Sequence, residues 1–393
     1  MHDEIVDRRG WISNERFLHA LNFCMLLPGP EAQQLAIYVG WLLNGTLGGI
    51  VAGVLFVLPA YFLILALSWT YAVHGDVSWV AAVFYGLRSA VIGLVAAAVI
   101  RVGAKALKTR PAWAIAAGAF VAIFFFDVPF PLIVGAAALA GAVAMKPAES
   151  PEIADTGPSP TWRRSAGVLL TGLAIWWLPL LLVIAWRGTG DTLSKEALFF
   201  SQAAMVTFGG AYAVLSYINQ AAVQQFGWLA PGQMVTGLGL AESTPGPLIM
   251  VTEFVGFLGG YNFPGGLDPV VAGVLGATVT TWATFAPCFL WIFLGAPYVE
   301  RLRGKKSLNG ALAAITAAVV GVILNLAVTF ATFALFDEVD DTGWFPVPDL
   351  GSADVFASAL ALAAFVALWR YRLNVLLVVL SSAGAGLLYR AAT

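Results

Sequence analysis

Apolar runs long enough to cross a lipid bilayer recur along almost the whole chain. A bilayer-crossing helix needs about 20 predominantly apolar residues, because its rise must match the thickness of the hydrocarbon core. The runs cover residues 12–44, 47–71, 79–100, 112–126, 131–144, 167–186, 197–218, 229–259, 270–294, 311–336, 353–369 and 375–389. They predict an all-α polytopic membrane protein with about 12 spans, surrounded by the lipid bilayer.

The charged fraction of the chain excludes an ordinary soluble domain. Only 11% of the 393 residues are charged and 60% are hydrophobic, whereas soluble domains carry about 25% charged residues. Two cysteines and three histidines are too few and too scattered for a disulfide framework or a metal site. We therefore expect no metal, no cofactor and no nucleic-acid partner.

The two halves of the chain resemble each other. Gly10-Trp11 matches Gly227-Trp228, and Pro28-Gly29-Pro30 matches Pro245-Gly246-Pro247, with the same Trp-to-Pro spacing in both halves. Between the halves lies a polar stretch rich in Pro, Glu and Ser. The matches predict an N-terminal membrane repeat (1–145), a cytoplasmic linker (146–166), a connecting span and loop (167–195) and a C-terminal membrane repeat (196–393).

The charge distribution predicts that the two repeats have inverted topology. If each segment with a PGP motif crosses the membrane once, an odd number of spans separates Trp11 from Trp228, so equivalent elements point in opposite directions. Basic residues favour the cytoplasmic side, and all the main basic groups fall on one side in this arrangement, whereas the acidic run 337–341 falls on the other. The basic groups lie at 101–110, 146, 163–164, 301–306 and 370–372. A re-entrant hairpin at each PGP motif is the alternative, which the charge distribution disfavours.

This topology predicts a multi-pass protein of a bacterial inner membrane. It also exposes a missing element. The counterpart of Phe208-Gly209-Gly210 in the first repeat would fall before Met1, so the first transmembrane helix of the N-terminal repeat is expected to be missing from this chain.

Each PGP motif predicts a broken helix at membrane depth. Proline removes a helical hydrogen bond and clashes with the preceding turn, and irregular backbone is tolerated in a membrane only where protein covers it or a watery cavity hydrates it. The half-helix that follows each break presents free N–H groups and the positive end of its dipole, which bind anions. Paired broken helices in inverted halves are typical of a transporter's central site. A kink that only relieves packing is the alternative.

Polar residues beside the two motifs are candidates for substrate binding and proton coupling. Ionisable groups inside a membrane are costly and are therefore usually functional. For Glu31, which directly follows the first motif, capping of the helix end is an equally good interpretation. The polar candidates are Glu31, Gln34, Glu242, Ser243 and Thr244, and the carboxyl groups that are candidates for proton coupling are Glu31, Glu242 and Glu253.

Two further features could contribute to an anion site. Arg88 lies within an apolar run and is the candidate cation, unless its side chain extends to the membrane surface. The segment from Phe208 to Tyr212 places Gly209 and Gly210 beside aromatic residues. Glycine there allows either tight helix packing or close approach of the backbone to a substrate.

Three segments resemble the chromate ion transporter family in its long, two-domain form. They are LNFCMLLPGPEAQQLAIYVGWLLNGTLGGIVAGVLFVLP, FGGAYAVLSYINQAAV and GLGLAESTPGPLIMVTEFVGFLGGY, and the resemblance covers nearly the whole chain. It implies secondary transport of chromate, with export driven by the proton-motive force and chromate resistance as the outcome. Protons and chromate are then the expected partners, with sulfate as a competitor. The implied site positions are Pro28, Gly29, Pro30, Glu31, Gln34, Phe208, Gly209, Gly210, Tyr212, Glu242, Thr244, Pro245, Gly246 and Pro247.

Other functions remain as alternatives. A sulfate or other oxyanion carrier would share the architecture and differ in substrate. An intramembrane hydrolase could use Ser243, but no Ser/Lys or His/Asp pair at helical spacing supports it, so we expect no enzymatic activity. A channel would conduct ions without pH dependence. The coupling ion, its stoichiometry and the oligomeric state, for which a homodimer is one form, stay open.

Overall fold

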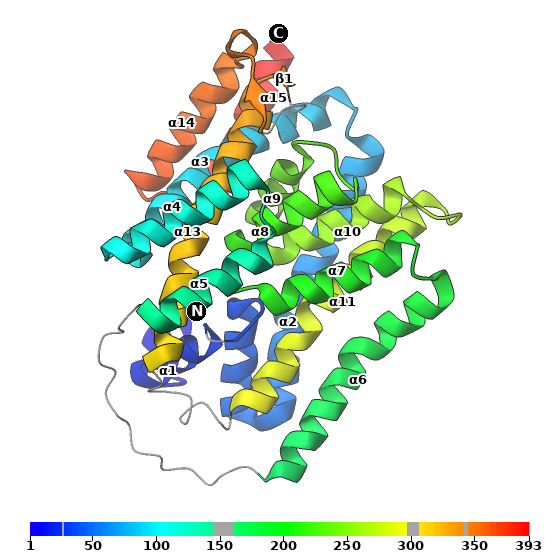
Figure 1. The fold of residues 1–393 in the computed structure, drawn as a ribbon. Coiled ribbons are helices and arrows are strands. Elements are labelled where there is room, and N and C mark those ends of the chain that lie inside the picture. Colours follow the sequence, from blue (N-terminus) through cyan, green and yellow to red (C-terminus); the bar gives the residue numbers. More distant parts are fainter. Residues whose placement is uncertain (26, 145–160, 209, 297–305, 341–344, 393) are drawn as a thin grey trace.

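The computed structural model describes residues 1–25, 27–144, 161–208, 210–296, 306–340 and 345–392, and almost all of them are helical (Figure 1). Helices satisfy every backbone hydrogen bond within one segment, which a chain surrounded by lipid requires. The expected all-α polytopic fold is therefore confirmed. Most of the predicted linker, 146–166, lies outside the described residues.

Among the described residues, six helices are long and apolar enough to span a membrane, and three shorter apolar helices accompany them. The long ones are α2 (Glu31–His74), α3 (Ser78–Ala106), α6 (Trp162–Arg187), α11 (Pro269–Gly295), α13 (Lys306–Leu335) and α15 (Val375–Ala392). The shorter ones are α4 (Arg110–Phe126), α5 (Phe130–Ala144) and α14 (Val355–Trp369).

The remaining elements are shorter. The helices are η1 (Asp3–Arg8), α1 (Asn14–Cys24), α7 (Thr192–Val206), α8 (Ala211–Asn219), η2 (Gln220–Gln225), α9 (Gln233–Ser243), η3 (Leu248–Met250), α10 (Val251–Asn262) and η5 (Leu350–Ser352). Strands β1 (Val339–Asp340) and β2 (Val347–Pro348) form an antiparallel pair.

Helix α2 changes direction at Asn44 and Gly45, where the backbone leaves the helical conformation. Gly45 has a φ of +62°, which glycine adopts without the steric cost of a Cβ. The helix then folds back on itself, because a Cβ on Gly40 would lie 2.5 Å from the carbonyl oxygen of Gly48. The predicted spans 12–44 and 47–71 therefore meet here at a tight turn.

Both PGP motifs interrupt helices, as the sequence predicts. Helix α1 ends at Cys24 and α2 begins at Glu31; helix α9 ends at Ser243 and the helical conformation resumes at Leu248. A third interruption lies between α7 and α8, where Gly210 has a φ of +102°. The sequence instead predicts one continuous span at 197–218.

Helices α7 to α10 form two hairpins, each of which returns to the side from which it started. The side-chain amide of Asn262, at the end of α10, donates to the carbonyl oxygen of Trp228, which precedes α9, at 2.9 Å. Phe226, after η2, stacks on Trp228 at 4.3 Å and contacts Phe199 of α7 at 5.6 Å between ring centroids. Runs 197–218 and 229–259 are thus helical hairpins, an arrangement that the sequence prediction of single crossings disfavoured.

The segments that carry the two PGP motifs pack against opposite ends of α11. Helix α10 lies against its first half, since a Cβ on Gly256 would lie 2.6 Å from the carbonyl oxygen of Gly276. Helix α1 lies against its last turns, where Phe23 contacts Gly295. This placement brings the two motifs towards the middle of the molecule from opposite directions.

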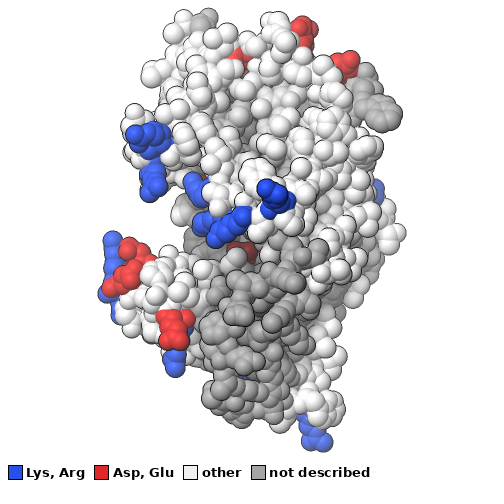
Figure 2. All heavy atoms as spheres, turned by 60° about the vertical axis from the view of Figure 1, so that its left-hand side comes forward, with Lys and Arg blue, Asp and Glu red and all other residues white. Residues whose placement is uncertain are grey.

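The outer surface is largely apolar. Figure 2 shows a face on which charged side chains form a few small groups on a mostly uncharged background. Leu170, Leu182 and Trp186 of α6 are examples of large apolar side chains that are more than half exposed. Contiguous exposed apolar surface of this extent fits a lipid environment rather than water.

Candidate functional site

The three helix interruptions meet near the middle of the molecule. The amide of Gly29 donates to the carbonyl oxygen of Thr207 at 2.9 Å. On the other side of the α7–α8 interruption, the hydroxyl of Tyr212 donates to Oε1 of Glu242 at 2.6 Å. The segment 207–212 is therefore held between the first PGP motif and the helix end that precedes the second. We call segments 28–34, 207–212 and 242–247 the central site; Gly209, one of its predicted residues, lies outside the described residues.

The first PGP motif is fixed by the helix that follows it. The side-chain amide of Gln34 donates to the carbonyl oxygen of Pro28 at 2.7 Å. This bond replaces a backbone hydrogen bond that the prolines prevent. Gly29 has a φ of +117° and lies against Gln34 and Cys288. Glu31 is half-buried in the first turn of α2, where a carboxyl group also interacts favourably with the helix dipole.

The second PGP motif forms an exposed tip. Pro245 and Gly246 are exposed, whereas Pro247 is buried. The hydroxyls of Ser243 and Thr244 donate to the carbonyl oxygens of Leu240 and Ala241, at 2.8 and 3.1 Å. These bonds satisfy carbonyl groups that the end of a helix leaves open, so both hydroxyls have a structural role in this conformation.

Helix α8 points its N-terminus into the central site without a side-chain cap. Its N-cap residue is Gly210, which has no side chain to accept from the first amides of the helix. Free N–H groups and the positive end of the dipole remain there. Phe208 and Tyr212 are both half-buried beside it. Such a helix end is suited to binding an anion.

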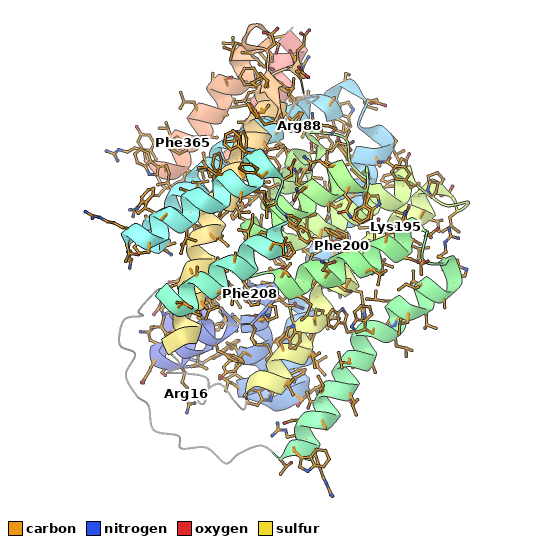
Figure 3. The ribbon with its side chains drawn as sticks, viewed as in Figure 1. Arg16, Arg88, Lys195, Phe200, Phe208 and Phe365 are labelled. Carbon is orange, nitrogen blue, oxygen red and sulfur yellow. The ribbon has the colours of Figure 1, made fainter. Side chains whose placement is uncertain are left out.

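The two arginines of α3 have different surroundings. Nε of half-buried Arg88 donates to Thr236 of α9 at 2.6 Å, and its Nη2 donates to Tyr71 of α2 at 3.3 Å. Arg88, labelled in Figure 3, thus joins three helices. Arg101, near the end of α3, instead interacts electrostatically with both Glu242 and Tyr212.

Arg101 is the functional candidate that the sequence assigned to a surface loop. Among the described residues it forms no hydrogen bond or ion pair, so its N–H donors are available to an anion. In the sequence Arg101 lies next to a group of basic residues that is typical of a cytoplasmic loop. That it lies near Glu242 follows only from the packing of α3 against α9.

Two carboxyl groups lie outside the central site in the helical core. Glu253 of α10 is fully buried, and neither of its carboxyl oxygens has a partner among the described residues. Glu196 of α7 is in the same situation, although sequence reasoning missed it. Its neighbour Lys195 is exposed, and a Lys-Glu pair near the end of an apolar run resembles a surface loop.

Comparisons with known proteins agree on one family. A profile described as chromate transporter matches residues 1–142 and 195–387. A probable chromate transport protein of Synechococcus elongatus is 32% identical over 83% of this chain and 78% of its own length. A chromate transport protein of Pseudomonas aeruginosa is 31% identical over 98% of this chain and 85% of its own. One of Cupriavidus metallidurans is 29% identical over 86% and 78%. No solved structure matches the chain.

Proposed function

The chain belongs to the chromate transporter family, and from this we propose that it is a secondary transporter that exports chromate from the cytoplasm and so confers chromate resistance. The observation that carries the proposal is the central site. It combines an uncapped helix N-terminus, an arginine with available donors and two PGP interruptions. A tetrahedral dianion needs such N–H donors and a compensating charge.

The membrane potential favours the export direction. Moving one elementary charge across 100 mV corresponds to about 2.3 kcal/mol, so a dianion that leaves a negative interior gains about 4.6 kcal/mol. Export therefore needs little further driving force, whereas uptake would need several coupled protons. We propose that proton coupling supplies the remainder.

We also propose that the chain consists of two inverted-topology repeats in a bacterial inner membrane, with the linker in the cytoplasm. The packing of the two PGP segments against opposite ends of α11 supports this. The distribution of basic residues supports it as well, because the connection from α3 to α4 carries Lys108, that from α14 to α15 carries Arg370 and Arg372, and both lie on the left side of Figure 1.

In this proposal the substrate is bound by the central site, and carboxyl groups carry the coupled protons. Arg101 supplies the positive charge, with Arg88 as the alternative cation. The proposed binding residues are Pro28, Gly29, Pro30, Glu31, Gln34, Phe208, Gly210, Tyr212, Glu242, Ser243, Thr244, Pro245, Gly246 and Pro247. Glu31, Glu242 and Glu253 are the proposed proton-coupling groups.

Uptake of labelled chromate into inverted membrane vesicles tests this function. Inverted vesicles turn cytoplasmic export into uptake, so chromate should accumulate when the vesicles are energised and should not when the chain is absent. Sulfate in excess shows which anion is preferred. If sulfate accumulates and chromate does not, the chain is a sulfate carrier; if neither accumulates, the proposed function is wrong.

Replacing Glu242 with glutamine should weaken the pH dependence of chromate binding. A carboxylate at this position would repel a dianion at the adjacent helix N-terminus, so the apparent affinity of the wild type should fall as the pH rises. Glutamine is always neutral and its carbonyl oxygen can still accept from Tyr212. The apparent KM should then change several-fold less between pH 6 and 8, taken as rough assay limits around neutrality.

The measurement is the initial rate of uptake at a series of chromate concentrations and pH values. Protonation of chromate itself affects both proteins alike, so their ratio isolates the side chain. Tyr212→Phe provides a matched comparison, because it removes the hydrogen bond that Glu242→Gln can keep and it retains the carboxyl group. Equal pH dependence of wild type and Glu242→Gln would contradict the assignment.

A further inference from the structure

Glu196 is a buried carboxyl group that the central site does not use. It lies near the start of α7, is completely inaccessible to solvent, and has no hydrogen-bond partner for either carboxyl oxygen among the described residues. An ionised carboxyl group without a partner is strongly disfavoured in such surroundings. This conformation therefore accommodates Glu196 as the neutral acid, which holds a proton.

Three glycines make room for polar side chains between α7, α10 and α11. A Cβ on Gly259 would overlap Oε1 of Glu196, and a Cβ on Gly276 would lie 2.8 Å from its Oε2. A Cβ on Gly256 would likewise overlap the hydroxyl oxygen of Thr280. The glycines bring the carboxyl and the hydroxyl directly against the α10 backbone, which a larger residue would prevent.

These groups form a series along α10. Glu253 belongs to α10 itself, Thr280 lies beside Gly256, and Glu196 lies beside Gly259. Positions three residues apart on a helix are separated by about 4.5 Å along its axis. All three side chains are buried, and the carboxyl and hydroxyl oxygens of all three lack a hydrogen-bond partner among the described residues. The series joins the start of α7 to the helix that follows the second PGP motif.

The charged groups around Glu196 lie at one end of the series. Asp191 acts on Glu196 electrostatically and is itself paired with Arg187 of α6, at 2.8 Å. Arg187 also donates to the carbonyl oxygen of Gly265 between α10 and α11, so these connections lie together, at the right of Figure 1. Lys195 is exposed there.

The helices packed against α7 contribute few other titratable groups. Helix α10 carries Glu253 and Tyr261, α11 carries only Cys288, and α8 carries Tyr212 and Tyr217. Helix α6, which also packs against α7, carries Arg163 and Arg164 at its start and Arg187 at its end. Figure 3 shows Lys195, Phe200 and Phe208 in this order from right to left along and beyond α7. Glu196 thus lies near the charged end of the helix, and the central site lies at the other.

We propose that Glu196, Thr280 and Glu253 form a proton path from the outer surface to the α9–α10 hairpin. The path rests on the proposed function and specifies how its proton coupling works. Glu253 is buried in the same way, with no hydrogen-bond partner among the described residues, so it first releases its own proton at the α9–α10 hairpin and becomes a carboxylate. The hydroxyl of Thr280 then gives its proton to Glu253 and takes one from the carboxyl of Glu196. Glu196 becomes the carboxylate, Glu253 becomes neutral, and a proton from the outer solution restores Glu196. Chains of carboxyl groups are a known form of proton relay in transporters.

The test uses the full chain reconstituted in lipid vesicles, with labelled chromate and a pH indicator. Glu196→Gln keeps the size of the side chain and removes the transferable proton. At equal pH, its rate of chromate exchange between the two sides should stay within about two-fold of the wild-type rate. Its rate of transport driven by a pH gradient should fall by at least about ten-fold. Lys195→Gln, on the adjacent exposed residue, should behave as wild type in both assays.

A second pair of variants covers the case in which Glu196→Gln does not fold. Thr280→Val keeps the shape and removes the hydroxyl, so it should slow gradient-driven transport, and Thr280→Ser should restore it. Infrared difference spectra provide a readout independent of chromate, because the carbonyl band of a protonated carboxyl group should respond to outer pH and lose intensity in Glu196→Gln.

The outcomes separate this proposal from the proposed function. A wild type that exchanges no chromate contradicts chromate transport, while the infrared band still tests the proton site. Unchanged gradient-driven transport in Glu196→Gln, equal rates for Thr280→Val and Thr280→Ser, or an unchanged infrared band would each overturn the path. Loss of exchange together with coupling in a folded Glu196→Gln would show that the residue is structural.

Discussion

Replacing Arg101 with glutamine should lower chromate transport by about 10- to 100-fold. Hydrogen bonds to charged groups contribute about 1.5–3 kcal/mol, and each 1.4 kcal/mol corresponds to a factor of ten. Arg101 is exposed and acts electrostatically on Glu242 and Tyr212, so the loss should come from substrate binding rather than from folding. The measurement is the apparent KM and maximal rate of chromate uptake into inverted vesicles, at equal protein content.

Two further variants decide which arginine binds the anion. Lys105→Gln removes a neighbouring charge from the same end of α3 and should change uptake by less than about two-fold. Lys105, unlike Arg101, does not act on Glu242 or Tyr212, and exposed charges at a distance are screened. Arg88→Gln breaks the link to Thr236 and Tyr71 and should mainly reduce the yield of folded protein. If Arg88→Gln folds and loses affinity while Arg101→Gln transports normally, Arg88 is the substrate-binding cation.

Replacing Gly29 with alanine should nearly abolish transport. Its φ of +117° is unfavourable for a residue with a Cβ, at a cost of about 1–3 kcal/mol. The added Cβ would also lie 3.0 Å from Nε2 of Gln34 and 3.1 Å from Sγ of Cys288. Relieving the backbone strain and these close contacts should move the first PGP motif away from Thr207, to which Gly29 donates. This movement should open the central site. Uptake per folded molecule is the quantity to measure.

Gly188→Ala is the matched control for backbone strain. Gly188 has a φ of +79° at the end of α6, and a Cβ there would meet no atom within 4 Å. Both variants should therefore lower the melting temperature in detergent, but only Gly29→Ala should lower transport per folded molecule. A Gly29→Ala protein that transports as well as Gly188→Ala would show that the first PGP motif is only a kink.

The broken helices at the two PGP motifs are predictable from sequence because proline acts locally. Pro28 and Pro245 each lack an N–H group, and no surrounding sequence can restore it. The break at Phe208-Gly209-Gly210 is not predictable in this way. Glycines in an apolar run are compatible with a continuous membrane helix, and the positive φ of Gly210 depends on its contacts in the folded chain.

The direction of each segment also depends on tertiary structure. Hydropathy measures the length of an apolar run, and a hairpin of two half-helices is as long and as apolar as one tilted span. Contacts such as that of Asn262 with Trp228 show that a run returns, but the two residues are far apart in sequence. The charge distribution nevertheless fits the observed hairpins. Two hairpins, at 197–218 and 229–259, return the chain to the side from which it started, as two single crossings would, so the later loops stay on the side that the charge distribution predicts.

The roles of individual charged residues were the hardest to predict. Arg101 lies at the end of its span and Glu196 beside a lysine, so both look like surface residues. Arg88 lies within an apolar run and looks like a site residue, although Thr236 and Tyr71 accept its hydrogen bonds. The position of a residue along its own helix says little about which other helices surround its side chain.

The close contact between α10 and α11 restricts which parts of the carrier can move. Gly256 and Gly276 bring the two backbones into direct contact, and Gly260 lies equally close to Ala272. Sliding one helix along the other would push larger residues into this space, so the pair should turn as one rigid body. A carrier must expose its substrate to one side at a time. The backbone torsions that change during this cycle should therefore be those of residues 207, 208, 210 and 244–247, where no helical hydrogen bonds have to be broken.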